Sequence, residues 1–97
     1  MFVGICQLGL ILPEGRSLKD KRSVVKSIRE RLRHRFNISI AEVGQHDALR
    51  RAEIGFAAVS NETVYLESLI DKIINYIESD GRVEINTIDR EIHKNGC

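Results

Sequence analysis

The spacing of apolar residues along this chain changes back and forth between the period of a strand and the period of a helix. Residues 2–12 are apolar at odd and even positions alike, apart from Gln7, which predicts a strand buried on both faces. Pro13 and Gly15 follow and are typical of a turn. Residues 18–35 then repeat apolar side chains three and four positions apart, which predicts an amphipathic helix with Ser17 as its N-cap.

The middle of the chain predicts two more strands. Residues 36–43 alternate, with Phe36, Ile38 and Ile40 on one side, and this pattern is typical of a half-buried strand. In residues 51–60 apolar and polar side chains alternate less strictly, which favours a central position in a sheet.

The last part of the chain predicts a second helix and a final strand. Ser60 or Asn61 is expected to cap the helix, with Glu62 in its first turn. Asp80 and Gly81 are expected to end it. Residues 82–88 predict the last strand, and the polar tail beyond them is expected to fray.

The element order β-α-β-β-α-β has a well-known packing solution. Two right-handed split βαβ units form a four-stranded antiparallel sheet with strand order 4-1-3-2 and both helices on one face. This is the ferredoxin-like α+β fold, and a chain of 97 residues is expected to form it as one domain over residues 1–97. Phe56 shares parity with Ile54 and Ala58, so we expect it on the helix-covered face. The open face is expected to carry Val3, Ile5, Gln7, Gly9, Ala41, Ala57 and Val59.

The charges are distributed unevenly along the chain. The whole chain has a formal net charge of +1, but residues 14–35 hold nine Lys and Arg against three acidic residues. Such a basic segment indicates a polyanionic partner more directly than net charge does. Five of its cations follow a 3-4-3-4 spacing and therefore share one side of the predicted helix. This basic ridge consists of Lys19, Arg22, Lys26, Arg29 and Arg33. It is expected either to bind phosphates or to form a solvated helix face without a partner.

Two further cations complete the candidate nucleic-acid-binding set. Arg16 lies in the turn before the helix, and Lys21 lies in its first turn. Lys21 projects near the centre of the apolar stripe. Its amine is expected either to reach solvent past the end of the core or to point into a pocket where an anion binds.

Several blocks of this sequence resemble the YlxP-like family of small bacterial proteins. They are SLKDKRSVVKSI at 17–28, RFNISIAEV at 35–43, Asp47, the pair at 51–52 and IGFAAVSN at 54–61. The resemblance spans essentially the whole chain and implies a ferredoxin-like fold and a cytoplasmic location. The family's genes often lie near genes for translation initiation and ribosome maturation, which implies association with RNA or the ribosome. It supplies no catalytic residue. After Asp47, where relatives often have an aromatic residue, this chain has Ala48, Leu49 and Arg50.

The motifs of common enzyme classes are missing from the sequence. There is no phosphate-binding glycine loop, nucleophile elbow or HExxH zinc motif. His46 and Asp47 lack the spacing of a metal site and are expected to be turn residues. Cys6 and Cys97 are expected to be reduced thiols. We therefore expect no enzyme activity, cofactor or metal, and no apolar run is long enough for a membrane span.

Three hypotheses about function follow. The first is a non-enzymatic protein that binds RNA or the ribosome, with the basic ridge, Arg16 and Lys21 contacting phosphates. The second is a homodimeric interaction module that uses the open sheet face and has no role with nucleic acids. An enzyme or small-anion sensor with a site at residues 16–22 ranks last, because no nucleophile or base lies there.

Overall fold

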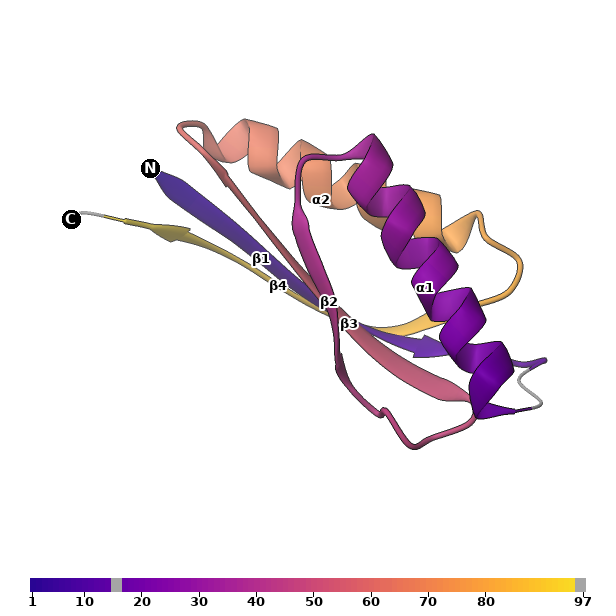
Figure 1. Cartoon of the computed structure of the whole chain (residues 1–97). Helices are drawn as coiled ribbons and strands as arrows, with labels where there is room; N and C mark the ends of the chain where they lie inside the picture. Colours follow the sequence, from indigo (N-terminus) through magenta and orange to yellow (C-terminus); the bar gives the residue numbers. More distant parts are fainter. Residues whose placement is uncertain (15–16, 96–97) are drawn as a thin grey trace.

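A computed structural model describes residues 1–14 and 17–95 of the chain (Figure 1). The elements follow the order β-α-β-β-α-β that the sequence predicts. They are β1 (Phe2–Ile11), α1 (Leu18–Arg35), β2 (Ser39–Gly44), β3 (Arg51–Ser60), α2 (Thr63–Glu78) and β4 (Glu84–Lys94).

The four strands form one antiparallel sheet in the order β2-β3-β1-β4. Read from the opposite edge, this is the predicted order 4-1-3-2. The two most apolar strands, β1 and β3, lie in the centre, where both their edges are paired. Both helices lie on the same face of the sheet, and the opposite face is left uncovered (Figure 1).

The core lies between the sheet and the two helices. Even-numbered residues of the central strands face it, and the register sets Cys6 opposite Phe56 and Leu8 opposite Ile54. All four are buried, and Phe56 is only 4% exposed. The predicted parity of β3 is therefore confirmed. The helices contribute the buried residues Val25, Ile28, Leu32, Leu66, Leu69, Ile70, Ile73, Ile74 and Ile77.

The prediction for the end of the chain is wrong. Strand β4 does not stop at Ile88 but continues to Lys94, and the segment expected to fray pairs with the first half of β1. Asp89 lies opposite Gln7, and Lys94 lies opposite Phe2. The segment is polar because β4 is an edge strand with one face open to solvent. From the sequence alone, such a polar segment cannot be distinguished from a frayed tail.

Other boundaries differ from the predictions as well, among them the start of β4, which lies at Glu84 rather than Arg82. Strand β2 begins at Ser39 rather than Phe36, because the Phe36 N–H still bonds the carbonyl of Leu32 as the C-cap of α1. The N-cap of α2 is Glu62 rather than Ser60 or Asn61, so Glu62 lies outside the first turn and makes no side-chain capping bond. The Ser60 hydroxyl instead accepts a bond of 3.1 Å from the Glu62 N–H. Helix α2 ends at Glu78, with Ser79 as its C-cap.

Candidate nucleic-acid interface

Helix α1 positions the basic ridge. Its start is fixed by Ser17, whose hydroxyl accepts a hydrogen bond of 3.1 Å from the backbone N–H of Asp20. Its rotation about its own axis is fixed by Val25, Ile28 and Leu32, which are buried against the sheet. Because residues three and four apart lie on one side of a helix, this rotation turns the ridge away from the core.

The structure places the ridge residues together on the flank of α1 nearest β2. The side chains of Lys19, Arg22, Lys26 and Arg33 are exposed, and Arg29 is half-buried. The side chain of Arg33 reaches across to β2, where its Nη2 donates to the carbonyl oxygen of Ile40 at 3.3 Å. Arg16 lies outside the described residues.

Little of the ridge's charge is neutralised within the part of the chain that the structure describes. One ion pair involves it, between Lys26 Nζ and Glu30 Oε1 at 4.0 Å, and both side chains are more than half exposed. Such exposed pairs contribute little. Arg29 has a buried Nε with no acceptor among the described residues. The ridge therefore offers exposed guanidinium and ammonium groups whose charge is largely unpaired among the described residues.

Lys21 does not belong to this surface. The sequence left open whether its amine reaches solvent or binds an anion, and both readings are wrong. The side chain is 1% exposed, and Nζ donates to the carbonyl oxygens of Gln45, Ala48 (2.8 Å) and His46 (3.4 Å). Glu42 Oε2 lies 3.6 Å away. The hydrogen bonds of the ammonium group all go to the segment after β2. We therefore remove Lys21 from the candidate nucleic-acid-binding set.

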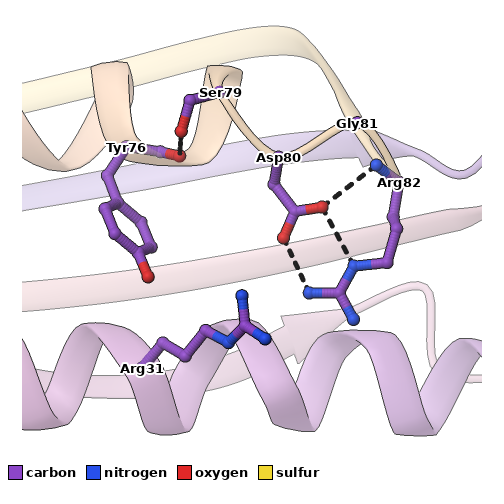
Figure 2. Close-up of a pocket in the computed structure, with 6 residues that line it drawn as sticks. All are labelled: Arg31, Tyr76, Ser79, Asp80, Gly81 and Arg82. Carbon is purple, nitrogen blue, oxygen red and sulfur yellow. Dashed lines mark hydrogen bonds and ion pairs between the residues drawn. The ribbon is translucent and has the colours of Figure 1, made fainter.

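A second basic stripe on α1, which the sequence reading missed, faces α2. The guanidinium carbon of Arg35 lies 5.3 Å from the ring centroid of Tyr76, a distance typical of a cation–π contact. Arg31 reaches into the space between Tyr76 and Asp80 (Figure 2). The signal that could have revealed these residues is their own helical spacing of four, on the far side of the apolar stripe from the ridge.

Arg31 lines a cavity of about 510 Å³ between the two helices (Figure 2). There the side chain of Arg82 donates two hydrogen bonds to Asp80, of 2.9 and 2.7 Å. These bonds lower the pKa of Asp80 below its ordinary value of 3.8, so the carboxylate is ionised. The end of α2 adds partial negative charge at this place. Arg31 and Arg82 therefore balance charges of the protein itself, and the cavity is a poorer anion site than the ridge.

The structure shows the surroundings of Cys6 and of the His46–Asp47 pair. Cys6 is fully buried, and burial raises the pKa of its thiol to about 11, so it is not a ready nucleophile. His46 and Asp47 are exposed in the loop before β3. Within residues 1–14 and 17–95, no three His, Cys, Asp or Glu side chains gather as metal ligands would. No helix in the same ranges is both long and apolar enough to cross a membrane.

The uncovered sheet face is partly apolar. Ile5 is 42% exposed and Val59 is 60% exposed, while Gln7 donates to Glu53 Oε2 at 3.0 Å. Gly9 has the parity of this face, as predicted, but it is buried, because the Thr87 side chain of β4 covers it and accepts a bond of 3.0 Å from its N–H. The accessible part of the predicted face thus consists of Val3, Ile5, Gln7, Ala41, Ala57 and Val59.

Solved structures with a similar backbone support the assignment of the fold. A de novo designed protein, Foldit4, has a TM-score of 0.55 at 13% identity, over 99% of this chain and 100% of that one. The designed protein LFR1 1, described as having a ferredoxin fold, has a TM-score of 0.50 at 15% identity, over 99% of this chain and 89% of that one. At such low identity the likeness concerns the fold alone.

Sequence relatives define the family. The chain is 36% identical over 88 residues to the uncharacterised protein YlxP of Bacillus subtilis strain 168, which covers 91% of this chain and 95% of that protein. Residues 3–90 match the family described as "Protein of unknown function (DUF503)". The match includes the ridge, the β2–β3 loop and both helices. The chain therefore belongs to the DUF503 family.

Proposed function

We propose that this protein is a non-enzymatic, cytoplasmic RNA-binding protein that associates with the ribosome or its RNA through the basic ridge of α1. The observation that carries the proposal is the composition of one helix flank. Lys19, Arg22, Lys26 and Arg33 are exposed there, Arg29 lies among them, and the described residues supply one weak ion pair to the set. Such a row of cations suits a phosphate backbone, because each contact releases condensed counterions.

The position of the cations within the helix supports a role beyond solubility. Lys19 lies in the first turn, where the helix dipole disfavours positive charge by about 0.3–1 kcal/mol, and Arg22 lies just beyond it, where this effect is weaker. A merely solvated helix face would be more stable with acidic residues at these positions. Cations placed there against the local field are consistent with selection for binding an anion.

The ridge also has a suitable length. From Lys19 to Arg33 the helix rises about 21 Å at roughly 1.5 Å per residue, and no bend is needed to keep the five cations on one side. Contacts of this kind are made to phosphates and are largely independent of sequence. The choice of RNA over DNA rests on the family resemblance rather than on the ridge.

Co-sedimentation with ribosomes tests the proposal. Wild-type protein should sediment with purified ribosomes at low salt and dissociate as salt is raised. The double variant R22E/K26E should remain in the supernatant. The matched control is K72E/K94E, which makes the same change in net charge on α2 and at the end of β4, away from the ridge. Loss of association in both double variants would indicate a general charge effect and contradict a role for the ridge.

A second candidate function rests on the open sheet face. Ile5 and Val59 are exposed there, and the Ile5–Ala57 pair lies near the middle of the face. A homodimer formed through this face would cover these residues and should bury about 1,200 Å² or more in total. Equilibrium sedimentation of the wild type and of I5K distinguishes a dimer formed through this face from a monomer. A dimer that I5K dissociates supports this function, and a monomer at high micromolar concentration rejects it.

A further inference from the structure

The segment between β2 and β3, residues 45–50, is fixed at both ends although its side chains are largely exposed. At one end the buried ammonium of Lys21 donates to the carbonyl oxygens of Gln45 and Ala48. At the other end the carbonyl of Arg50 accepts a bond of 2.8 Å from the N–H of Leu12. We call this segment the Lys21-held loop.

The conformation of the loop is unusual for its composition. Gln45 has a φ of 58°, in the left-handed region that residues with a Cβ rarely adopt, and residues 45–50 contain no glycine. A buried lysine is also rare and requires partners, which here are backbone carbonyls of the loop itself. An exposed connection does not need such support to join two strands. A loop held in one shape with exposed side chains is typical of a recognition element.

The side chains that the loop presents fit an unpaired nucleotide. Leu49 is 47% exposed, and His46 and Arg50 are also exposed. Imidazole rings and apolar side chains pack against the faces of unstacked bases, and an arginine beside them contacts phosphate. Asp47 is the one acidic side chain in the loop.

The loop lies at the N-terminal end of the ridge. Lys21 belongs to the first turn of α1, directly beside Arg22 in sequence, and it bonds the loop. The ridge itself runs along the β2 side of α1, as the bond from Arg33 to Ile40 shows. The loop continues from the end of β2. The ridge and the loop therefore form one surface.

We infer that the Lys21-held loop is the part of this surface that receives a single-stranded RNA segment, with Leu49 and His46 against a base and Arg50 on a phosphate. Lys21 is then a positioning residue that fixes the loop without touching RNA. The inference rests on the proposed function. The inference adds to the proposed function a preference for unpaired over duplex RNA, which the ridge alone would not provide.

Fluorescence anisotropy with a labelled oligouridylate and with a labelled RNA duplex of equal length tests the inference. R50Q should weaken binding of the single strand by about tenfold and lessen its salt dependence, since one phosphate contact is lost. L49S should weaken binding of the single strand by roughly five- to tenfold, leave the salt dependence unchanged and leave duplex binding unaffected. D47N should tighten binding, because an anion is removed from the surface. The matched control is R51Q, since Arg51 has the parity of the open sheet face.

The outcomes separate the inference from the proposed function. If R50Q and L49S bind like the wild type while R22E/K26E does not, the loop assignment is overturned and the ridge stands. If the wild type binds neither RNA at low salt, the proposed function fails and the inference fails with it. If L49S loses ribosome association while its RNA affinity is unchanged, the loop contacts a protein, and its assignment to RNA is overturned. An unchanged midpoint of urea unfolding for each variant establishes that the fold is retained.

Discussion

The ammonium group of Lys21 donates a hydrogen bond of 2.8 Å to the carbonyl oxygen of Ala48, and it does so from a side chain that is 1% exposed. This contact connects the first turn of α1 to the loop between β2 and β3. A charged group in the core is stable only when its donors are satisfied, and here the loop carbonyls and Glu42 satisfy them. Lys21 thus joins the first turn of the basic helix to the neighbouring loop and helps to fix the shape of that loop.

Replacing Lys21 with Met should destabilise the protein and loosen the loop. The methionine side chain fills similar space but leaves the part-buried loop carbonyls and Glu42 without their donor, at a cost of about 1–3 kcal/mol in the free energy of unfolding. Amide hydrogen exchange at Ala48, whose N–H bonds Gln45, should accelerate more than exchange in β1. The control is K19M, in the same turn but exposed. Equal stability of K21M and K19M in urea would contradict the role assigned to Lys21.

Phe56 should be among the residues whose truncation costs most. It is 4% exposed on the helix-covered face, so Phe56→Ala should lower the free energy of unfolding by about 3–5 kcal/mol. Val59, three residues further along the same strand, is 60% exposed on the open face. Val59→Thr keeps a β-branched side chain and should change stability by less than about 0.5 kcal/mol. Similar losses in the two variants would show that both faces of the sheet are covered in solution.

Arg29 should be dispensable for stability. Its Nε is buried without an acceptor among the described residues, and an unsatisfied buried donor costs about 1–3 kcal/mol. Arg29→Met keeps the apolar stem and removes that donor, so the free energy of unfolding should stay the same or rise. Urea unfolding measures this, with R22M as the exposed control. A marked loss of stability in R29M alone would mean that the guanidinium makes a structural bond.

The Asp80–Arg82 pair should contribute to stability at neutral pH and not in acid. The hydrogen bonds from Arg82 lower the pKa of Asp80 below 3.8 in the folded protein. The contribution is therefore present above the unfolded-state pKa and is lost as the pH falls through the lowered folded-state value. In urea unfolding, the free energies of unfolding of the wild type and of D80N should differ at about pH 7 and converge as the pH falls below the lowered folded-state pKa of Asp80. A difference that stays constant over this range would show that the pair is not ionic.

The sequence predicts the fold well because the periodicity of its elements is strong and local. The buried stripes of both helices and the parity of Phe56 follow from spacing alone. The extent of β4 could not be predicted in this way. Residues 89–94 are polar apart from Ile92, and they form a strand because β1 offers them a partner far away in the sequence.

The candidate site was predicted less completely. Helical spacing identifies the ridge, since residues such as Lys19 and Arg33 share a flank through local geometry. The same spacing gives the direction of Lys21 but not its partners, which lie 24 to 27 residues away in the chain. Arg31 and Arg35 were missed as a second stripe because their neighbours belong to α2. Tertiary contacts thus separate the free cations from those that the protein uses internally.

The dependence of RNA affinity on salt tests the role of the ridge most directly. If its five cations contact phosphates, the logarithm of the association constant for an oligouridylate should fall against the logarithm of salt concentration with a slope of about −3.5. R22E/K26E should bind more weakly and flatten that slope by about 1.4, whereas K72E/K94E should keep the wild-type slope. R22E/K26E should retain the fold, since Arg22 and Lys26 are both exposed positions of helix α1. Binding by R22E/K26E with the wild-type slope, or no binding by the wild type at low salt, would contradict the assignment of α1 as the RNA-binding element.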